Sequence, residues 1–211
     1  MSDAASLGLF AALVFGVIVL PGLDMAFVLG RALRDGRAGG FAAVAGIVAG
    51  GVCHVLMTTL GVSVLLRVLP GAFNALLLAG ALYLAWIGIG LLRSAAAPSL
   101  APDASARPQG AAFRQGMLTA LLNPKAYLFM LAVFPQFLRS GAGALAAQAA
   151  LLWLIIAANQ LCVYGGVVLL ADRARAWLRG RPATGLAAVR GVGLLLIAAA
   201  LLTGLEGWRR L

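Results

Sequence analysis

Long apolar runs separated by short polar gaps form the main pattern along this chain. Six runs reach the roughly 20 residues that a helix needs to cross a hydrocarbon core of about 30 Å. They cover residues 6–29, 40–66, 70–92, 116–138, 143–171 and 189–207. The pattern therefore predicts an all-α polytopic membrane protein with six transmembrane helices.

The charges in the gaps predict the orientation of these helices. Eleven arginines lie in the first, third and fifth gaps, whereas the two tails and the remaining gaps together hold four. Positive residues are enriched on the cytoplasmic side of membrane proteins, so both termini are predicted to lie outside. The basic segment at residues 173–181 is predicted to lie along the inner surface, or to serve only as a topology signal.

One long gap divides the predicted membrane domain, residues 1–211, into two halves. Residues 94–115 are rich in Ala, Pro and Ser and lack helical periodicity, which predicts a flexible cytoplasmic linker. The halves, residues 1–93 and 116–211, each hold three predicted helices. Because three is odd, the second half must cross the membrane in the opposite sense, which makes the halves two inverted repeats.

Composition agrees with a membrane protein and argues against other classes. Of the 211 residues, 63% are hydrophobic and 10% charged, whereas soluble domains have about a quarter charged. The mean hydropathy is +1.03. The net charge of +10 is not arranged as a basic stripe with aromatics, so nucleic-acid binding is not indicated. Cys53 and Cys162 lack CxxC spacing, so no metal site, disulfide or cofactor is expected.

Two apolar runs are interrupted by groups that hydrocarbon tolerates poorly. The first contains Pro21, Gly22 and Asp24, and the fourth contains Asn123-Pro124-Lys125. A lysine near the bilayer centre costs roughly 2.5–3.5 kcal/mol on insertion scales, and a proline leaves a helical carbonyl without its donor. Such groups must face protein or water. Interrupted helices at corresponding positions of inverted halves indicate the binding site of a secondary transporter.

Asp24 and Lys125 are the main candidates for transport chemistry. Asp24 is the only carboxylate well inside an apolar run, and Lys125 is the only lysine. We hypothesise that both face one cavity, where Asp24 exchanges a proton or binds an amino group and Lys125 binds a carboxylate. The alternative is a structural ion pair or a capped kink. Asn123 either satisfies backbone groups freed by Pro124 or binds substrate.

Other polar or small residues within the apolar runs have two interpretations each. Asn159, Gln160 and Tyr164 form hydrogen bonds between helices or line the cavity. Gly46 and Gly50 form a GxxxG pattern, which predicts close helix packing and leaves a homo-oligomer open.

No enzyme is predicted. His54 is the only histidine, and Ser63, nine residues later, would lie on the opposite face of a continuous helix. The two cannot form a nucleophile and its base. The sequence contains no Walker A motif, so ATP hydrolysis is not indicated. A cation exporter would need more ligands than one Asp, one His and two scattered Cys supply.

Five segments resemble, in order and over the whole chain, the lysine exporter (LysE/RhtB) translocator family. They read PGLDM at residues 21–25, RALRDGRAG at 31–39, GIVAG at 46–50, LNPKA at 122–126 and FPQF at 134–137. Leu23 departs from the family's Pro-Gly-Pro-Asp motif. The resemblance implies a multi-pass exporter of amino acids or their derivatives in the bacterial inner membrane, coupled to protons, with Asp24 and the Asn123-Pro124-Lys125 triplet at its centre.

The substrate prediction follows from the number of buried charges. A second intramembrane acid would favour a basic amino acid, and the sequence has none, so a neutral amino acid such as threonine or homoserine is favoured over lysine. The alternatives are an exporter of another small molecule or cation, and a structural membrane subunit that transports nothing.

Overall fold

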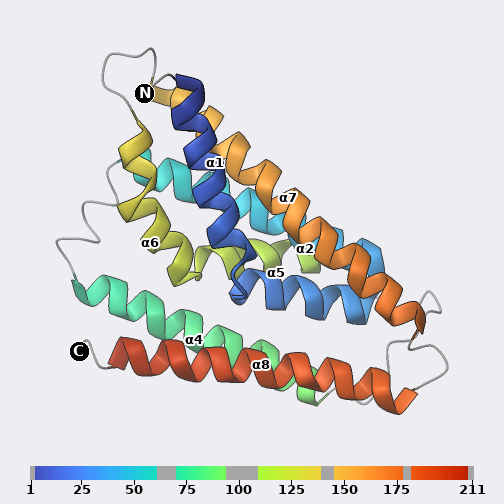
Figure 1. Cartoon of the computed structure of the whole chain (residues 1–211). Helices are drawn as coiled ribbons and strands as arrows, with labels where there is room; N and C mark the ends of the chain where they lie inside the picture. Colours follow the sequence, from blue (N-terminus) through green and yellow to red (C-terminus); the bar gives the residue numbers. More distant parts are fainter. Residues whose placement is uncertain (1–2, 61–69, 94–108, 139–144, 178–181, 209–211) are drawn as a thin grey trace.

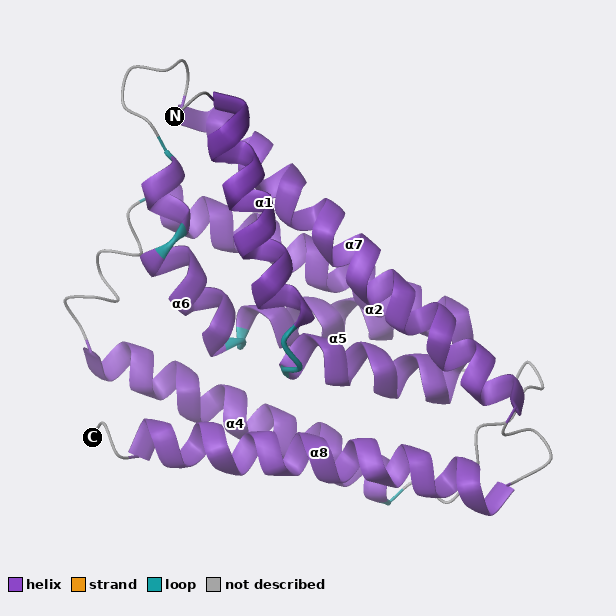
Figure 2. Ribbon diagram, viewed as in Figure 1, coloured by secondary structure: helices purple, strands orange, loops and turns teal. Residues whose placement is uncertain are grey.

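The computed structural model describes residues 3–60, 70–93, 109–138, 145–177 and 182–208. Every regular element in these ranges is helical (Figure 1, Figure 2). The α-helices are α1 (Asp3–Val19), α2 (Leu23–Thr59), α4 (Pro70–Leu92), α5 (Gln109–Leu121), α6 (Pro124–Ala132), α7 (Leu145–Trp177) and α8 (Pro182–Trp208), and η1 (Phe134–Phe137) is a 3-10 helix. The all-α prediction is therefore confirmed for the described part.

Helix α2 consists of two helical segments. Its 37 residues would extend about 55 Å if straight, far more than a bilayer core requires. Gly36 interrupts it with φ 71° and ψ −164°, a conformation that residues with a Cβ rarely adopt. The chain reverses within α2, between its blue and cyan parts in Figure 1. A side chain at Gly36 would also collide with the guanidinium of Arg175 on α7.

The helices pack in two groups. Helix α2 packs against α5 and α7, and α1 lies against α7. Helices α4 and α8 lie side by side and contact the rest mainly through α2 (Figure 1). Large aromatic and aliphatic side chains such as Phe10, Phe27 and Ile47 fill the centre. Leucines on the outside, including Leu82 and Leu202, are about 70% exposed, as expected for side chains that face lipid.

Small residues allow α2 and α5 to approach closely. A methyl group at Gly46 would overlap the backbone of Phe113, and one at Gly116 would overlap the backbone of Ala43. A methyl at Gly50 would lie 2.7 Å from the Cβ of Ala120. The predicted close packing at the GxxxG pattern is therefore confirmed, and its partner is α5 of the same chain.

The described helices identify a multi-pass membrane protein. Three of them are long and apolar enough to cross a membrane, over Leu23–Thr59, Leu145–Arg175 and Ala183–Leu202. Helix α5 and the segment Pro124–Phe137, which meet at 51°, form a fourth span if taken together. The predicted total of six spans and the location of the termini stay predictions.

One loop prediction differs from the structure. Residues 109–115, predicted as the end of the linker, form the first two turns of α5. Alanine, glutamine and arginine, all good helix formers, supply most of this segment, so the helix extends beyond the apolar run. Helix α7 continues to Trp177, through part of the basic segment, and the position of that segment at the inner surface stays a prediction. Residues 94–108 lie outside the described part.

Candidate functional site

Both predicted helix breaks are present. Helix α1 ends at Val19, and α2 begins at Leu23 with Gly22 as its N-cap. Helix α5 ends at Leu121, and α6 begins at Pro124, where a missing N–H is harmless because the first turn has no helical acceptor. Asn123 caps α6, since its side-chain oxygen accepts a hydrogen bond of 3.0 Å from the backbone N–H of Lys125. The two breaks place four helix ends near one another.

His54 compensates for the donor that Pro124 lacks. A residue with an N–H at position 124 would donate to the carbonyl of Ala120 in a continuous helix. Nε2 of His54 lies 2.9 Å from that carbonyl oxygen, and because a carbonyl only accepts, Nε2 must carry the hydrogen. The backbone N–H of Asn123 donates to the same oxygen at 3.1 Å. The His54 ring also packs edge-on against Tyr127, with centroids 4.6 Å apart.

Lys125 joins the two breaks. Its Nζ donates to the carbonyl oxygens of Val17 at 3.0 Å and Leu20 at 3.1 Å, which lie at the end of α1. A cation is favourable there because the last carbonyls of a helix carry partial negative charge. A Cβ at Gly22 would lie 3.2 Å from Nζ, so a glycine leaves room for the lysine. An ammonium has three N–H donors, and these two bonds use two of them.

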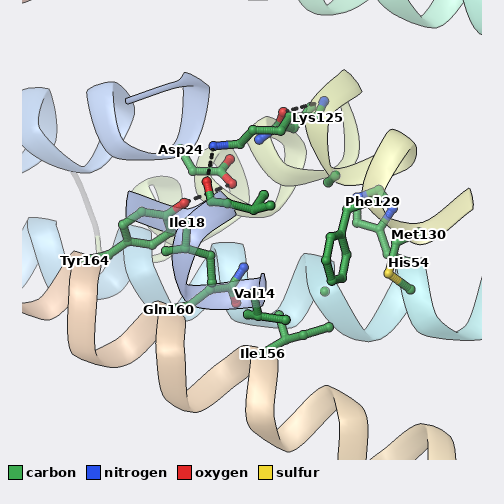
Figure 3. Close-up of a pocket in the computed structure, with 14 residues that line it drawn as sticks. Val14, Ile18, Asp24, His54, Lys125, Phe129, Met130, Ile156, Gln160 and Tyr164 are labelled. Carbon is green, nitrogen blue, oxygen red and sulfur yellow. Dashed lines mark hydrogen bonds between the residues drawn. The ribbon is translucent and has the colours of Figure 1, made fainter. Parts of the chain in front are cut away.

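Asp24 lies in the first turn of α2, where the positive end of the helix favours a carboxylate. Its side chain is buried, and the hydroxyl of Tyr164 donates to Oδ2 at 3.5 Å (Figure 3). Oδ1 of Asp24 and Nδ2 of Asn123 are also buried, and neither has a hydrogen-bond partner within the described part of the chain. Asp24 and Lys125 line one cavity, yet the two described side chains form no ion pair.

The Asp24 cavity, as we call it, lies between α1, α2, α6 and α7. Its volume is about 70 Å3, which is room for several waters or a small polar group. Most of its wall is apolar. The polar side chains that line it are Asp24, His54, Asn123, Lys125, Gln160 and Tyr164 (Figure 3). A carboxylate, an ammonium and neutral hydrogen-bonding groups thus converge in an apolar setting, as small-molecule sites require.

The predicted site residues divide into three groups. Asp24, Asn123, Lys125, Gln160 and Tyr164 line the cavity, and Gly22, Pro21 and Pro124 form the breaks beside it. Asn159 is not part of the lining, because its amide donates at 2.9 Å to the carbonyl of Ile155 on its own helix.

Sequence reasoning missed His54, Phe129 and Met130 as lining residues. The position of His54 inside an apolar run could have indicated it, because a histidine is rare there. Phe129 and Met130 do not differ in type from the other residues of their apolar run, so the sequence could not have indicated them.

Interrupted membrane helices that enclose a buried, charged cavity define the class of membrane transport proteins. The particular family follows from sequence comparison. The chain belongs to the LysE type translocator family, whose profile matches residues 15–205. The predicted family membership is therefore confirmed.

Relatives agree with this assignment. The chain is 33% identical over 186 residues to an uncharacterized membrane protein of Pseudomonas aeruginosa, covering 86% of each chain. It is 32% identical over 160 residues to a homoserine/homoserine lactone efflux protein of Salmonella typhimurium, covering 76% of this chain and 77% of the relative. A leucine efflux protein of Klebsiella pneumoniae is 33% identical over 123 residues, 58% of each chain. No solved structure matches the chain significantly.

Proposed function

We propose that the protein is a secondary active exporter of amino acids or their derivatives across the bacterial inner membrane, coupled to the proton gradient. The observation that carries the proposal is the meeting of Asp24, Asn123 and Lys125 at one cavity. They lie at two helix breaks, residues 20–22 and residues 122–123, that are about 100 residues apart in the sequence. Nothing in helix packing alone requires a buried carboxylate with an unpartnered oxygen at such a point.

A neutral amino acid is the substrate that the cavity favours. Lys125 has one N–H donor left for a substrate carboxylate, and Asp24 offers a buried acceptor for the amino group. The surrounding wall is apolar and includes Val14, Ile18 and Phe129. A lysine side chain would bring a second ammonium for which the described lining has no second carboxylate. Two relatives are named for the efflux of homoserine or its lactone and of leucine, which supports threonine, homoserine or a similar substrate.

Asp24 is the proposed proton carrier. It is buried, it forms no ion pair with Lys125, and a neutral hydroxyl is the donor to its Oδ2. Burial favours the protonated carboxyl, whereas the Lys125 ammonium and the positive end of α2 favour the carboxylate, so Asp24 can alternate between the two states as the cavity opens to either side. Binding of the substrate's ammonium would favour the ionised state, which links substrate loading to proton release.

The six-span, inverted-repeat topology is part of the proposal. Helix α2 contributes the end of the predicted first span and residues 40–59 of the predicted second span, because the chain reverses at Gly36. The pairings also suit exchange of the two halves: α2 packs on α5, α1 on α7, and α4 on α8. These are first-half to second-half contacts of the second span with the fourth, the first with the fifth, and the third with the sixth. If the halves are exchanged, the first span takes the place of the fourth, the second of the fifth and the third of the sixth. The same three contacts then result.

An efflux experiment tests the function. Cells preloaded with a mixed pool of amino acids are followed by mass spectrometry, with the proton gradient intact or collapsed, for wild type, Asp24→Asn and Lys125→Ala. Asp172→Asn is the matched control, because this carboxylate pairs with Arg37 outside the cavity. We expect gradient-dependent loss of one or a few neutral amino acids in wild type and Asp172→Asn only. Equal efflux from all four proteins, each present at the same level in the membrane, would refute the proposed roles of Asp24 and Lys125.

A further inference from the structure

A second cavity lies further along α2. It has a volume of about 190 Å3 and is enclosed by residues of α2, α4, α5 and α8. It shares no described lining residue with the Asp24 cavity. Arg31, Arg34 and Gln115 are its polar lining residues, and Phe27 and Trp86 contribute to its apolar wall. We call it the Arg31 cavity.

This cavity carries positive charge. Arg31 is buried, and its Nη1 lies 2.8 Å from Oδ2 of Asp35. The side chain of Arg34 is about one-third exposed, and its Nε lies 3.6 Å from Oδ1 of the same aspartate. Among the described residues, the two guanidinium groups form ion pairs with the same carboxylate, that of Asp35. The partly exposed, planar guanidinium of Arg34 suits the binding of a further anion, a carboxylate or a phosphate.

The two cavities lie along one helix. Arg31 follows Asp24 by seven residues, two helical turns, which places the two on the same face of α2 and about 10 Å apart. Phe27, which is 2% exposed, lies between them on the helix and lines the Arg31 cavity. The arginines belong to a gap that the positive-inside rule assigns to the cytoplasm. The Arg31 cavity thus lies on the side from which an exporter takes its substrate.

We propose that the Arg31 cavity is a loading site that binds the carboxylate of the substrate on the cytoplasmic side before the substrate reaches Asp24. This inference rests on the proposed export function. Arg34 supplies the accessible guanidinium, whereas Arg31 is held by Asp35 at the inner wall. The loading site raises the occupancy of the transporter at low cytoplasmic concentrations, and the Asp24 cavity performs the proton-coupled step.

Everted membrane vesicles test the loading site, because their cytoplasmic face is outward. Uptake of radiolabelled homoserine and of homoserine lactone is measured over a range of concentrations for wild type, Arg34→Gln, Arg34→Lys and Arg37→Gln. The lactone is a cyclic ester without a carboxylate charge. Arg37 is the matched control: it lies in the same gap, its Nε is 3.3 Å from Asp172, and it lines neither cavity.

We expect Arg34→Gln to raise the half-saturating concentration of homoserine about tenfold, the effect of losing one charged hydrogen bond, with the maximal rate retained. The half-saturating concentration of the lactone should change less than twofold in Arg34→Gln. For homoserine, Arg34→Lys should give a value between those of wild type and Arg34→Gln, and Arg37→Gln should give the wild-type value. If wild type takes up homoserine and Arg34→Gln has the same half-saturating concentration as Arg37→Gln, the loading site is overturned and the proposed function stands. Absence of uptake of both probes, and of leucine, by wild type would overturn the proposed function and the loading site with it.

Reconstitution distinguishes a substrate carboxylate from a lipid phosphate. The same variants are assayed in vesicles of phosphatidylcholine alone and of phosphatidylcholine with phosphatidylglycerol. If the Arg34→Gln effect persists in the neutral lipid, the substrate is the anion that Arg34 binds. If the effect appears only when phosphatidylglycerol is present, the cavity holds a lipid headgroup and the loading site is overturned.

Discussion

The hydrogen bond from His54 to Ala120 offers a quantitative test of how the second helix break is stabilised. His54→Phe removes the Nε2–H donor but keeps an aromatic ring against Tyr127. His54→Leu removes both the donor and the ring. Comparing the two variants therefore separates the hydrogen bond from the ring contact.

The expected size of each effect follows from the local geometry. The Ala120 carbonyl keeps the N–H of Asn123 when His54 is replaced, so no buried carbonyl is left without a donor. The loss is then one neutral hydrogen bond, which in membrane proteins averages about 0.6 kcal/mol and reaches about 1.7. We expect His54→Phe to lower the free energy of unfolding by about 0.5–1 kcal/mol. His54→Leu should lower it by about 0.5–1.5 kcal/mol more, because an edge-on aromatic pair is lost as well.

A double-mutant cycle tests the link to Pro124. An alanine at position 124 allows α5 to continue into α6, and in that continuous helix its N–H donates to the Ala120 carbonyl, so His54 is no longer needed as a substitute donor. The free energy of unfolding is measured in mixed micelles by titration with a denaturing detergent, for wild type, His54→Phe, Pro124→Ala and the double variant. The effect of His54→Phe should fall by at least half in the Pro124→Ala background. An equal effect in both backgrounds would refute the compensation of Pro124 by His54.

Three further predictions concern packing, capping and the cavity wall. Gly46→Ala should lower the free energy of unfolding by about 1–3 kcal/mol through overpacking, whereas Gly166→Ala, which meets no neighbour within 4 Å, should not, as detergent titration would show. Lys125→Met should lower the free energy of unfolding by about 2 kcal/mol, because the charged hydrogen bonds to the end of α1 are lost. An unchanged free energy of unfolding would contradict the capping role of Lys125. Gln160→Ala should reduce efflux at least fivefold and the neighbouring Asn159→Ala less than twofold, and equal effects would argue against the assigned cavity wall.

The helix breaks and the charged residues beside them could be predicted from the sequence because both violate the rules of a membrane helix locally. A proline, a glycine or a lysine inside an apolar run is visible without any knowledge of the fold. The predicted common cavity of Asp24 and Lys125 required one further step, the comparison of the two halves. The structure places both residues on one cavity.

The partners of these residues could not be predicted, because they are set by tertiary contacts. Lys125 contacts carbonyls 105 and 108 residues earlier in the chain, and His54 contacts a carbonyl 66 residues later. Backbone carbonyls have no residue identity, so no sequence pattern marks them as partners. The start of α5 at Gln109 was missed for a different reason, since a polar helix end beyond the apolar run resembles a linker in composition.

The two carbonyl bonds of Lys125 imply a mechanical linkage between substrate binding and the position of α1. The ammonium that caps α1 is the group that the proposed function assigns to the substrate carboxylate, and the glycine at position 22 leaves room beside it. A carboxylate that draws Nζ towards itself weakens the hold on Val17 and Leu20. Under the proposed function, binding of the substrate would therefore release the C-terminal end of α1, and one shared side chain would couple occupancy of the cavity to movement of a helix.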